Sequence, residues 1–223
     1  MVALFVIATF LVFLFIDYLI QKKTQPAEVQ EPARRSFERF VIPRGYFFSQ
    51  KHAWLEILGS GNARVGIDDF VQKIIGSIDS VRLVPEKIAV KRGDPILTIT
   101  QNGRELSLGA PISGKVLAVN DALLKSPELL TQDPYLSGWI ATIQPENISS
   151  ELKSMSVAEE AAIWLRKEVT RFRDFITVRT PQLATGVTML DGGLPVVGAL
   201  KGADVSVWKE FEQEFLSPAQ GQA

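Results

Sequence analysis

The sequence predicts a mainly β fold with flanking helices: an antiparallel β sandwich that follows a single N-terminal transmembrane helix and precedes a C-terminal helical extension. Three patterns indicate this arrangement: an uncharged apolar run at the N-terminus, alternating apolar and polar residues around Asn102-Gly103, and helical spacing of apolar residues near the C-terminus. We therefore divide the chain into an anchor at residues 1–21, a linker at 22–41, a sandwich domain at 42–150 and an extension at 151–223.

The composition limits the possible chemistry. Of the 223 residues, 46% are hydrophobic and 22% are charged, which is typical of a folded protein. The chain has no cysteine, so disulfides, thiol catalysis and thiolate metal sites are excluded. A formal net charge of -1 gives no electrostatic reason to expect nucleic acid as a partner.

The N-terminal run predicts a membrane anchor. Val2 to Ile16 carries no charge, and about 20 residues rising about 1.5 Å each reach across a hydrocarbon core of about 30 Å. A cleaved signal peptide is the alternative, but no basic residue precedes the run and no small-residue cleavage site directly follows it. Lys22 and Lys23 follow the run, so the positive-inside tendency places the N-terminus outside and the globular domain in the cytoplasm. We expect a single-pass protein of the inner (cytoplasmic) membrane that contacts the bilayer through residues 2–20.

Residues 22–41 are predicted to be a linker. Thr24 to Ala33 is rich in Gln, Glu and Pro, a composition typical of a tether. The basic and aromatic segment from Arg34 to Phe40 either lies on an anionic leaflet or forms a solvated approach to the folded domain.

From Ile42 the pattern is that of a small antiparallel sandwich, because β-prone runs are separated by Gly, Pro, Asn and Asp. Asn102-Gly103 tolerates positive φ at both positions and predicts a two-residue hairpin turn with Gly103 at its tip. Asp68 to Ile75 predicts a short helix that Asp68 or Asp69 caps. The expected strands are Trp54–Leu58, Ser80–Val84, Ile96–Thr100, Glu105–Leu108, Gly114–Val119 and Trp139–Ile143.

Several runs of this region resemble motifs of the glycine cleavage system H protein family, in the same order along the chain. They include Ser49-Gln50-Lys51-His52-Ala53-Trp54, Arg64 to Gln72, Ala110-Pro111-Ile112-Ser113-Gly114, Gly114 to Asn120, and Asp133-Pro134-Tyr135. The resemblance extends from Pro43 to Pro145 and implies a lipoyl-domain-like sandwich of the barrel-sandwich hybrid type. In that family a lysine on an exposed hairpin turn carries a swinging lipoamide arm.

This chain departs from the family at the attachment site. The family's lysine position falls on Gly103, flanked by Asn102 and Arg104, and a guanidinium is not an acyl acceptor. The resemblance therefore implies a degenerate lipoyl site, and we expect no cofactor. Attachment to a displaced lysine is the alternative. The lysines elsewhere on the sandwich include Lys87, Lys91 and Lys115.

No residue pattern predicts catalysis. His52 is the only histidine, which excludes a cluster of histidine metal ligands, and its strand position favours a structural role over that of a general base. Asp68 and Asp69 are adjacent, and helix capping explains them more simply than paired catalytic carboxylates. We expect no catalytic residue, no metal site and no enzymatic activity.

The extension predicts two amphipathic helices. Ser156-Val157-Ala158-Glu159 is a capping-box signature, so the first helix is expected from Ser156 to Ile176. The second is expected from Ala203 to Leu216 and carries acidic residues, which either pair with the basic first helix or dock elsewhere. The aromatic residues of both helices either pack on the sandwich or form an exposed docking surface. The candidates for such a surface are Trp164, Phe172, Trp208, Phe211 and Phe215.

Together these features predict a membrane-anchored, non-lipoylated and non-catalytic scaffold. Its partners would be other protein subunits of a membrane-associated complex, such as a respiratory or redox complex, and not nucleic acid. The alternative is a membrane-tethered carrier that holds a lipoyl or other acyl group on a displaced lysine.

Overall fold

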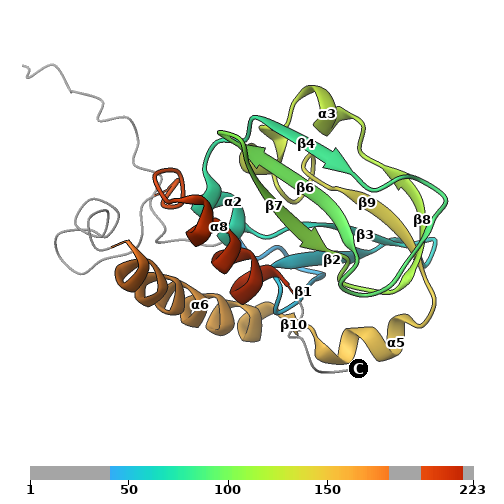
Figure 1. Cartoon of the computed structure of the whole chain (residues 1–223). Helices are drawn as coiled ribbons and strands as arrows, with labels where there is room; N and C mark the ends of the chain where they lie inside the picture. The colour runs from blue at the N-terminus through green and yellow to red at the C-terminus, as the bar shows by residue number, and fades with distance from the viewer. Residues whose placement is uncertain (1–40, 181–196, 218–223) are drawn as a thin grey trace, which may run out of the picture. The chain divides into compact units, whose positions relative to one another are not determined.

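The computed structural model describes residues 41–180 and 197–217, whose strands form two antiparallel sheets (Figure 1). The larger sheet has the strand order β10-β1-β2-β3-β9-β8-β5, and the smaller has the order β4-β6-β7. The larger sheet comprises β10 (Ser156–Val157), β1 (Tyr46–Phe48), β2 (Ala53–Ile57), β3 (Ala63–Ile67), β9 (Ala141–Pro145), β8 (Gly114–Val119) and β5 (Ala89–Val90). The smaller comprises β4 (Ser80–Leu83), β6 (Pro95–Gln101) and β7 (Arg104–Gly109). The predicted mainly β, antiparallel fold is confirmed.

All the expected strands are present, with bounds that differ by no more than two residues from those predicted. The sequence did not predict β1, β3, β5 and β10. The last two contain two residues each, so they exist as strands only because β8 and β1 pair with them. The Trp54 ring packs against the backbone of Gly66 in β3, and a Cβ added to Gly66 would come within 2.4 Å of the indole. A glycine at that position weakens the sequence signal for a strand although packing demands it.

The helices lie around the sheets, and most are short. Asp68 caps the first of them, as predicted: its Oδ1 accepts hydrogen bonds from the backbone N–H of Phe70 at 3.1 Å and of Val71 at 3.0 Å. The helices are α2 (Asp69–Ile75), α3 (Ala122–Lys125), α4 (Leu129–Gln132), α5 (Ile148–Glu151), the 3-10 helix η1 (Leu152–Ser154), α6 (Ala158–Arg179), α8 (Val205–Phe211) and the π-helical turn η2 (Glu212–Leu216).

The predicted capping box at Ser156 is wrong. Ser156 lies in β10, opposite Phe48 of β1, and the helix begins two residues later at Ala158. Val157 occupies the N-cap position, where no side chain accepts a hydrogen bond from the first turn. Because Val157 is the N-cap, Ser156 lies one residue too early in the chain to cap the first turn.

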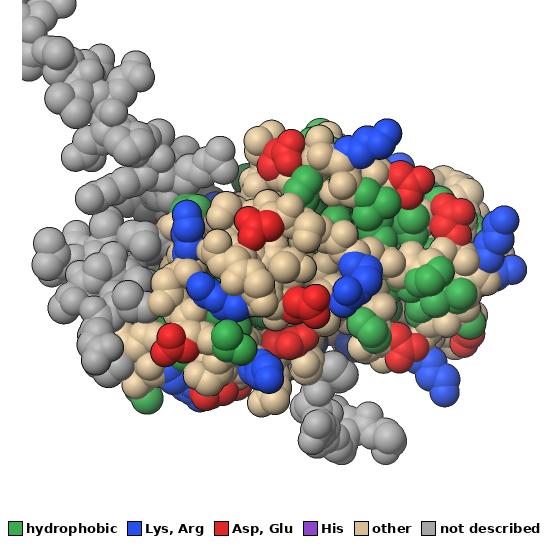
Figure 2. Space-filling model, turned by 45° about the horizontal axis from the view of Figure 1, so that its top comes forward, with side chains coloured by type: hydrophobic (Ala, Val, Ile, Leu, Met, Phe, Trp, Pro, Cys, Tyr) green, Lys and Arg blue, Asp and Glu red, His purple; other side chains and the backbone are tan. Residues whose placement is uncertain are grey.

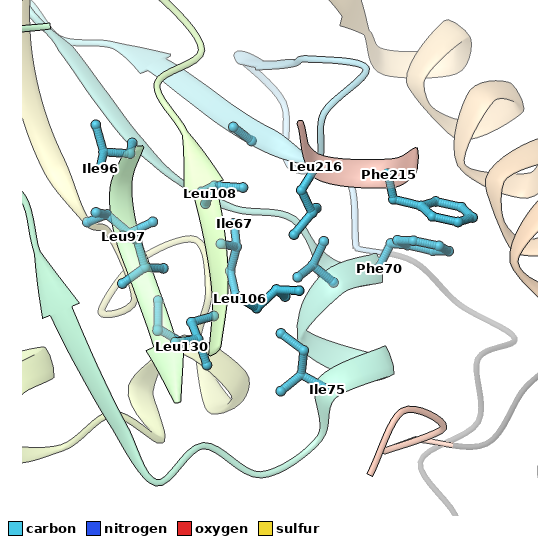
Figure 3. Packing of buried hydrophobic residues seen from close by; sticks show 14 of the residues in the cluster. Ile67, Phe70, Ile75, Ile96, Leu97, Leu106, Leu108, Leu130, Phe215 and Leu216 are labelled. Atoms are coloured by element: carbon cyan, nitrogen blue, oxygen red, sulfur yellow. The ribbon is translucent and has the colours of Figure 1, made fainter. Parts of the chain in front are cut away.

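The two helices of the extension pack on the sandwich and complete its core. Figure 3 shows Phe215 beside Phe70 of α2, with Leu216 and the strand residue Leu106 in the same cluster. The Phe70 and Phe215 rings are stacked with centroids 6.1 Å apart, and Phe211 stacks on Phe215 at 4.9 Å. The fold therefore places the extension against the sandwich through aromatic contacts.

This packing corrects the prediction of an aromatic docking surface. Phe172, Phe211 and Phe215 are fully buried, Trp208 is 1% exposed, and Trp164 is partly buried against the same core. These side chains fill the space between the helices and α2, and so they are not presented to a partner.

Within the described part of the chain, none of the helices combines the length and apolar character that a membrane crossing needs. The predicted anchor at residues 1–21 lies outside the described residues, as does the linker up to residue 40.

Replacing Phe215 by alanine tests whether the extension belongs to the core. We expect Phe215→Ala to lower the free energy of unfolding by about 3 to 5 kcal/mol, because a large buried ring is lost. The matched control is Val205→Ala in the first turn of α8, where the side chain is 54% exposed and the expected change is below about 0.5 kcal/mol. Urea unfolding of both variants measures the difference, and equal stabilities would contradict this packing.

Candidate functional site

The hairpin of β6 and β7 ends in the predicted two-residue turn. Asn102 and Gly103 both have positive φ, at 50° and 74°, as a type I′ turn requires. The backbone N–H of Asn102 donates to Asp79 Oδ2 at 2.6 Å. On the inner side, the buried Gln101 amide donates to the backbone carbonyls of Ile75, at 3.0 Å, and of Ser77. These contacts hold the base of the turn and leave its tip exposed.

Gly103 lies at the tip of this turn, and the space around it is open. A Cβ added there would meet no heavy atom within 4 Å. The tip is therefore shaped and exposed as a modified turn would be, but it offers no amine.

The residue after the turn binds the extension. Arg104 Nη1 donates to the backbone carbonyl of Lys201 at 3.0 Å and to that of Ala203 at 2.7 Å. Its guanidinium also lies over the Trp208 ring, 5.6 Å from the centroid. Trp208 Nε1 donates to the carbonyl of Leu200 at 2.9 Å. The turn formed by residues 197–203 is thereby fixed beside the hairpin, at the start of the last, red segment in Figure 1.

The same turn is also bound to the end of α2. Gly198 N donates to the Lys73 carbonyl at 2.7 Å, and Leu200 N donates to the Ile74 carbonyl at 3.2 Å. The two backbones approach so closely that a Cβ on Gly76 would lie 2.8 Å from the Cα of Gly198. Gly76 is thus required by contact as well as by its positive φ of 76°. Sequence reasoning did not find this site, because its two halves lie almost 100 residues apart along the chain.

His52 lies in a buried cluster at the junction of β2, α2 and α6. Its Nδ1 is 2.7 Å from Asp68 Oδ2, and its Nε2 is 3.5 Å from Glu168 Oε2, which is an ion-pair distance and not a hydrogen bond. The ring stacks on Phe70 at 4.3 Å and lies 4.9 Å from Trp164. His52 and Asp68 are fully buried, which favours a structural role for this cluster.

The charges of this cluster shift two pKa values. Burial lowers the pKa of His52, but the carboxylates of Asp68 and Glu168 outweigh it and hold the pKa above its ordinary value. Burial raises the pKa of Glu168, but His52 and Arg171 outweigh it and hold that pKa below its ordinary value. Each shift favours the charged form of its group, at the contact between α6 and the sandwich.

The rest of the described surface carries charges of both signs and one cleft. Among the described residues, no group of three or more His, Cys, Asp or Glu side chains is arranged so that it could hold a metal ion. Figure 2 shows acidic and basic side chains interspersed over one face. A cleft of about 530 Å³ near the turn between β1 and β2 has both basic and apolar lining, including Lys51, Arg92, Pro111 and Leu216.

Comparisons with known proteins agree on one family. The family model described as Glycine cleavage H-protein matches residues 46–168, which extends beyond Pro145, where the motif resemblance ended. A probable glycine cleavage system H protein from Thermococcus kodakarensis is 37% identical over 127 residues, covering 57% of this chain and 94% of that protein. Glycine cleavage system H protein 2 from Aquifex aeolicus is 30% identical over 132 residues, covering 59% and 82%. A crystal structure of a glycine cleavage system H protein from Mycobacterium marinum is 26% identical, covers 57% of this chain and 98% of that one, and has a TM-score of 0.47.

The buried ion pairs predict a pH-dependent stability. A raised pKa for His52 means that its contribution is fully present below its unfolded-state pKa of about 6.5 and is lost as the pH rises through the folded-state pKa. We expect the free energy of unfolding to fall as the pH rises through this range. The fall should be smaller in Glu168→Gln, because only Asp68 still raises the pKa of His52 in that variant.

Urea unfolding between about pH 5 and about pH 9 measures this dependence. The matched control is Glu160→Gln, an exposed position on the same helix, which should keep the wild-type profile. An unchanged profile in Glu168→Gln would show that Glu168 does not interact with the His52 charge.

Proposed function

Because this chain belongs to the glycine cleavage H-protein family, we propose that it is a carrier protein that holds a lipoyl or similar acyl group on a lysine outside the hairpin turn. Members of this family are carriers and not enzymes. The observation that carries the proposal is the extent of the match, since residues 46–168 include both sheets and the β6–β7 hairpin. Because the match covers the whole domain, it supports the carrier function of the family more than it supports a new function.

A displaced lysine follows from combining the family with this chain's own turn. Gly103 has no amine, and the Arg104 side chain donates hydrogen bonds to the carbonyls of Lys201 and Ala203. A carrier built on this domain must therefore form its amide linkage elsewhere.

The second candidate function is the non-lipoylated scaffold, and Gly103 is the observation that favours it. In that case the domain would serve only to bind other subunits. The relatives reported above are named as H proteins, so the comparisons favour the carrier over the scaffold.

The proposed setting is the membrane surface. The apolar run at residues 2–20 would tether the carrier to the bilayer, with the domain in the cytoplasm. Family members interact with other glycine cleavage subunits, and the partners proposed for this chain are protein subunits that load and unload its acyl group.

Intact mass of the full chain, extracted with detergent from its own host, tests the carrier function. We expect a mass increment equal to one acyl group in amide linkage, which resists hydroxylamine because an amide, unlike a thioester, is not cleaved by it. An ordinary H protein expressed in the same cells serves as the control for an active modifying pathway.

An unmodified chain beside a fully modified control would contradict the carrier function. If that unmodified chain also co-purifies in a stoichiometric complex, the scaffold is the better description.

A further inference from the structure

We propose that Lys201 is the displaced attachment site, on which an acyl group is held in amide linkage beside the hairpin tip. This inference rests on the proposed carrier function and names the residue that performs it. Four features single out Lys201: its place next to the hairpin, the rigidity of its turn, the freedom of its side chain, and the poorer placement of the other lysines.

Lys201 lies beside the vacated position at Gly103. Arg104 directly follows Gly103 in the chain, and its Nη1 donates to the backbone carbonyl of Lys201 at 3.0 Å. The backbone of Lys201 is therefore one arginine side chain away from the hairpin turn. An enzyme that approaches the exposed hairpin end would meet the Lys201 turn on the same part of the surface.

The turn that carries Lys201 is held from both sides. Lys201 N donates to the Gly198 carbonyl at 2.8 Å, and Ala203 N donates to the Leu200 carbonyl at 3.0 Å, so the turn is closed on itself. On either side of the lysine, Leu200 is fully buried and Ala203 is 2% exposed. A rigid scaffold that presents one residue on a surface turn is the usual arrangement for a functional side chain.

The side chain of Lys201 is exposed, and none of the described residues makes an ion pair or hydrogen bond with its Nζ. Its neighbour Gly202 is exposed and has no side chain. An amine with no salt-bridge partner has no ionic contact to break before it reacts.

Two other lysines on surface turns lie at the wrong end of the sandwich. In the pairing of β4 with β6, Ser80 opposite Thr100 is near the hairpin tip, and Leu83 opposite Leu97 is at the far end. Lys87 and Lys91 follow the far end of β4.

The remaining described lysines are enclosed, paired or set on regular elements. Lys73 is buried and forms an ion pair with Asp69 at 2.7 Å. Burial and the nearby Arg171 lower the pKa of Lys51, which favours nucleophilic character, but its half-buried Nζ donates to the Glu214 carbonyl at 3.4 Å. The others lie on strands or helices or at their ends: Lys115, Lys125, Lys153, Lys167 and Lys209.

The acyl transfer that this requires is balanced when an acyl thioester is the donor. The Lys201 ammonium first gives one proton to solvent, and the neutral amine attacks the thioester carbonyl carbon. A C–N bond forms, the C–S bond breaks, and the second proton of the nitrogen leaves with the thiolate as a free thiol. The products are the amide, one thiol and one released proton, with no oxidant or reductant.

Three variants of the full chain, made in its own host, test the assignment by intact mass and peptide mapping. Lys201→Arg keeps the positive charge but cannot accept the acyl group, so we expect complete loss of the increment. Lys87→Arg is the matched control, exposed and on a turn at the far end, and should keep it. Gly103→Lys places an amine at the open hairpin tip and reports whether the modifying enzyme engages this end of the domain. A circular dichroism spectrum of each variant confirms that it is folded.

The possible outcomes separate the two proposals. Loss in Lys201→Arg, with retention in Lys87→Arg and a mapped adduct on Lys201, supports the assignment. An increment that persists in Lys201→Arg and maps to another lysine overturns the assignment and leaves the carrier function standing. A wild-type chain without any increment, in cells where the ordinary H protein is modified, overturns both.

Discussion

Phe70 is the side chain on which the arrangement of the whole protein depends. It lies in the first turn of α2, stacks on His52 at 4.3 Å and on Phe215 at 6.1 Å, and meets the edge of Phe172 at 6.0 Å. One ring thus contacts the larger sheet, α6 and the C-terminal segment. Because interiors are close-packed, a partner missing from any of these sides would leave a void at the centre of the molecule.

The polar groups around this aromatic core reinforce the same contacts. Arg171 lies 4.2 Å above the centroid of Phe215 and donates to the carbonyl of Glu214 at 2.8 Å. Arg179 covers Phe175 in the same way and pairs with the carboxylates of Glu210 and Glu214. The basic helix α6 and the acidic C-terminal segment therefore pair with each other, which was one of the two arrangements that their charges allowed. The Arg171–Phe215 cation–π contact and the ion pairs of Arg179 join these two elements and fix their register more than nonspecific apolar packing would.

Local patterns predicted much of the fold and little of the candidate site. The Asn102-Gly103 turn, the Asp68 cap and the central strands follow from turn chemistry and alternation within a few residues, and the structure has them. The capping box at Ser156 failed because β10 pairs with β1 through Val157, so that the helix begins one residue later than the motif requires. The aromatic residues were identified correctly as apolar stripes, but their partner, α2, could not be read from spacing alone. Glu168 and the turn at Lys201 carried no local signal, since each makes its contacts with residues that are distant along the chain.

The hairpin and the extension hold each other in place. The residue after the turn, Arg104, is engaged with the carbonyls of residues 201 and 203 and with the Trp208 ring. Such an anchor suits a short, closed turn, and Asn102-Gly103 supplies one. The extension in turn depends on the hairpin, because its turn at residues 197–203 is held between Arg104 and the end of α2. The hairpin and the neighbouring turn thus hold each other through Arg104, and Lys201 is exposed on that turn.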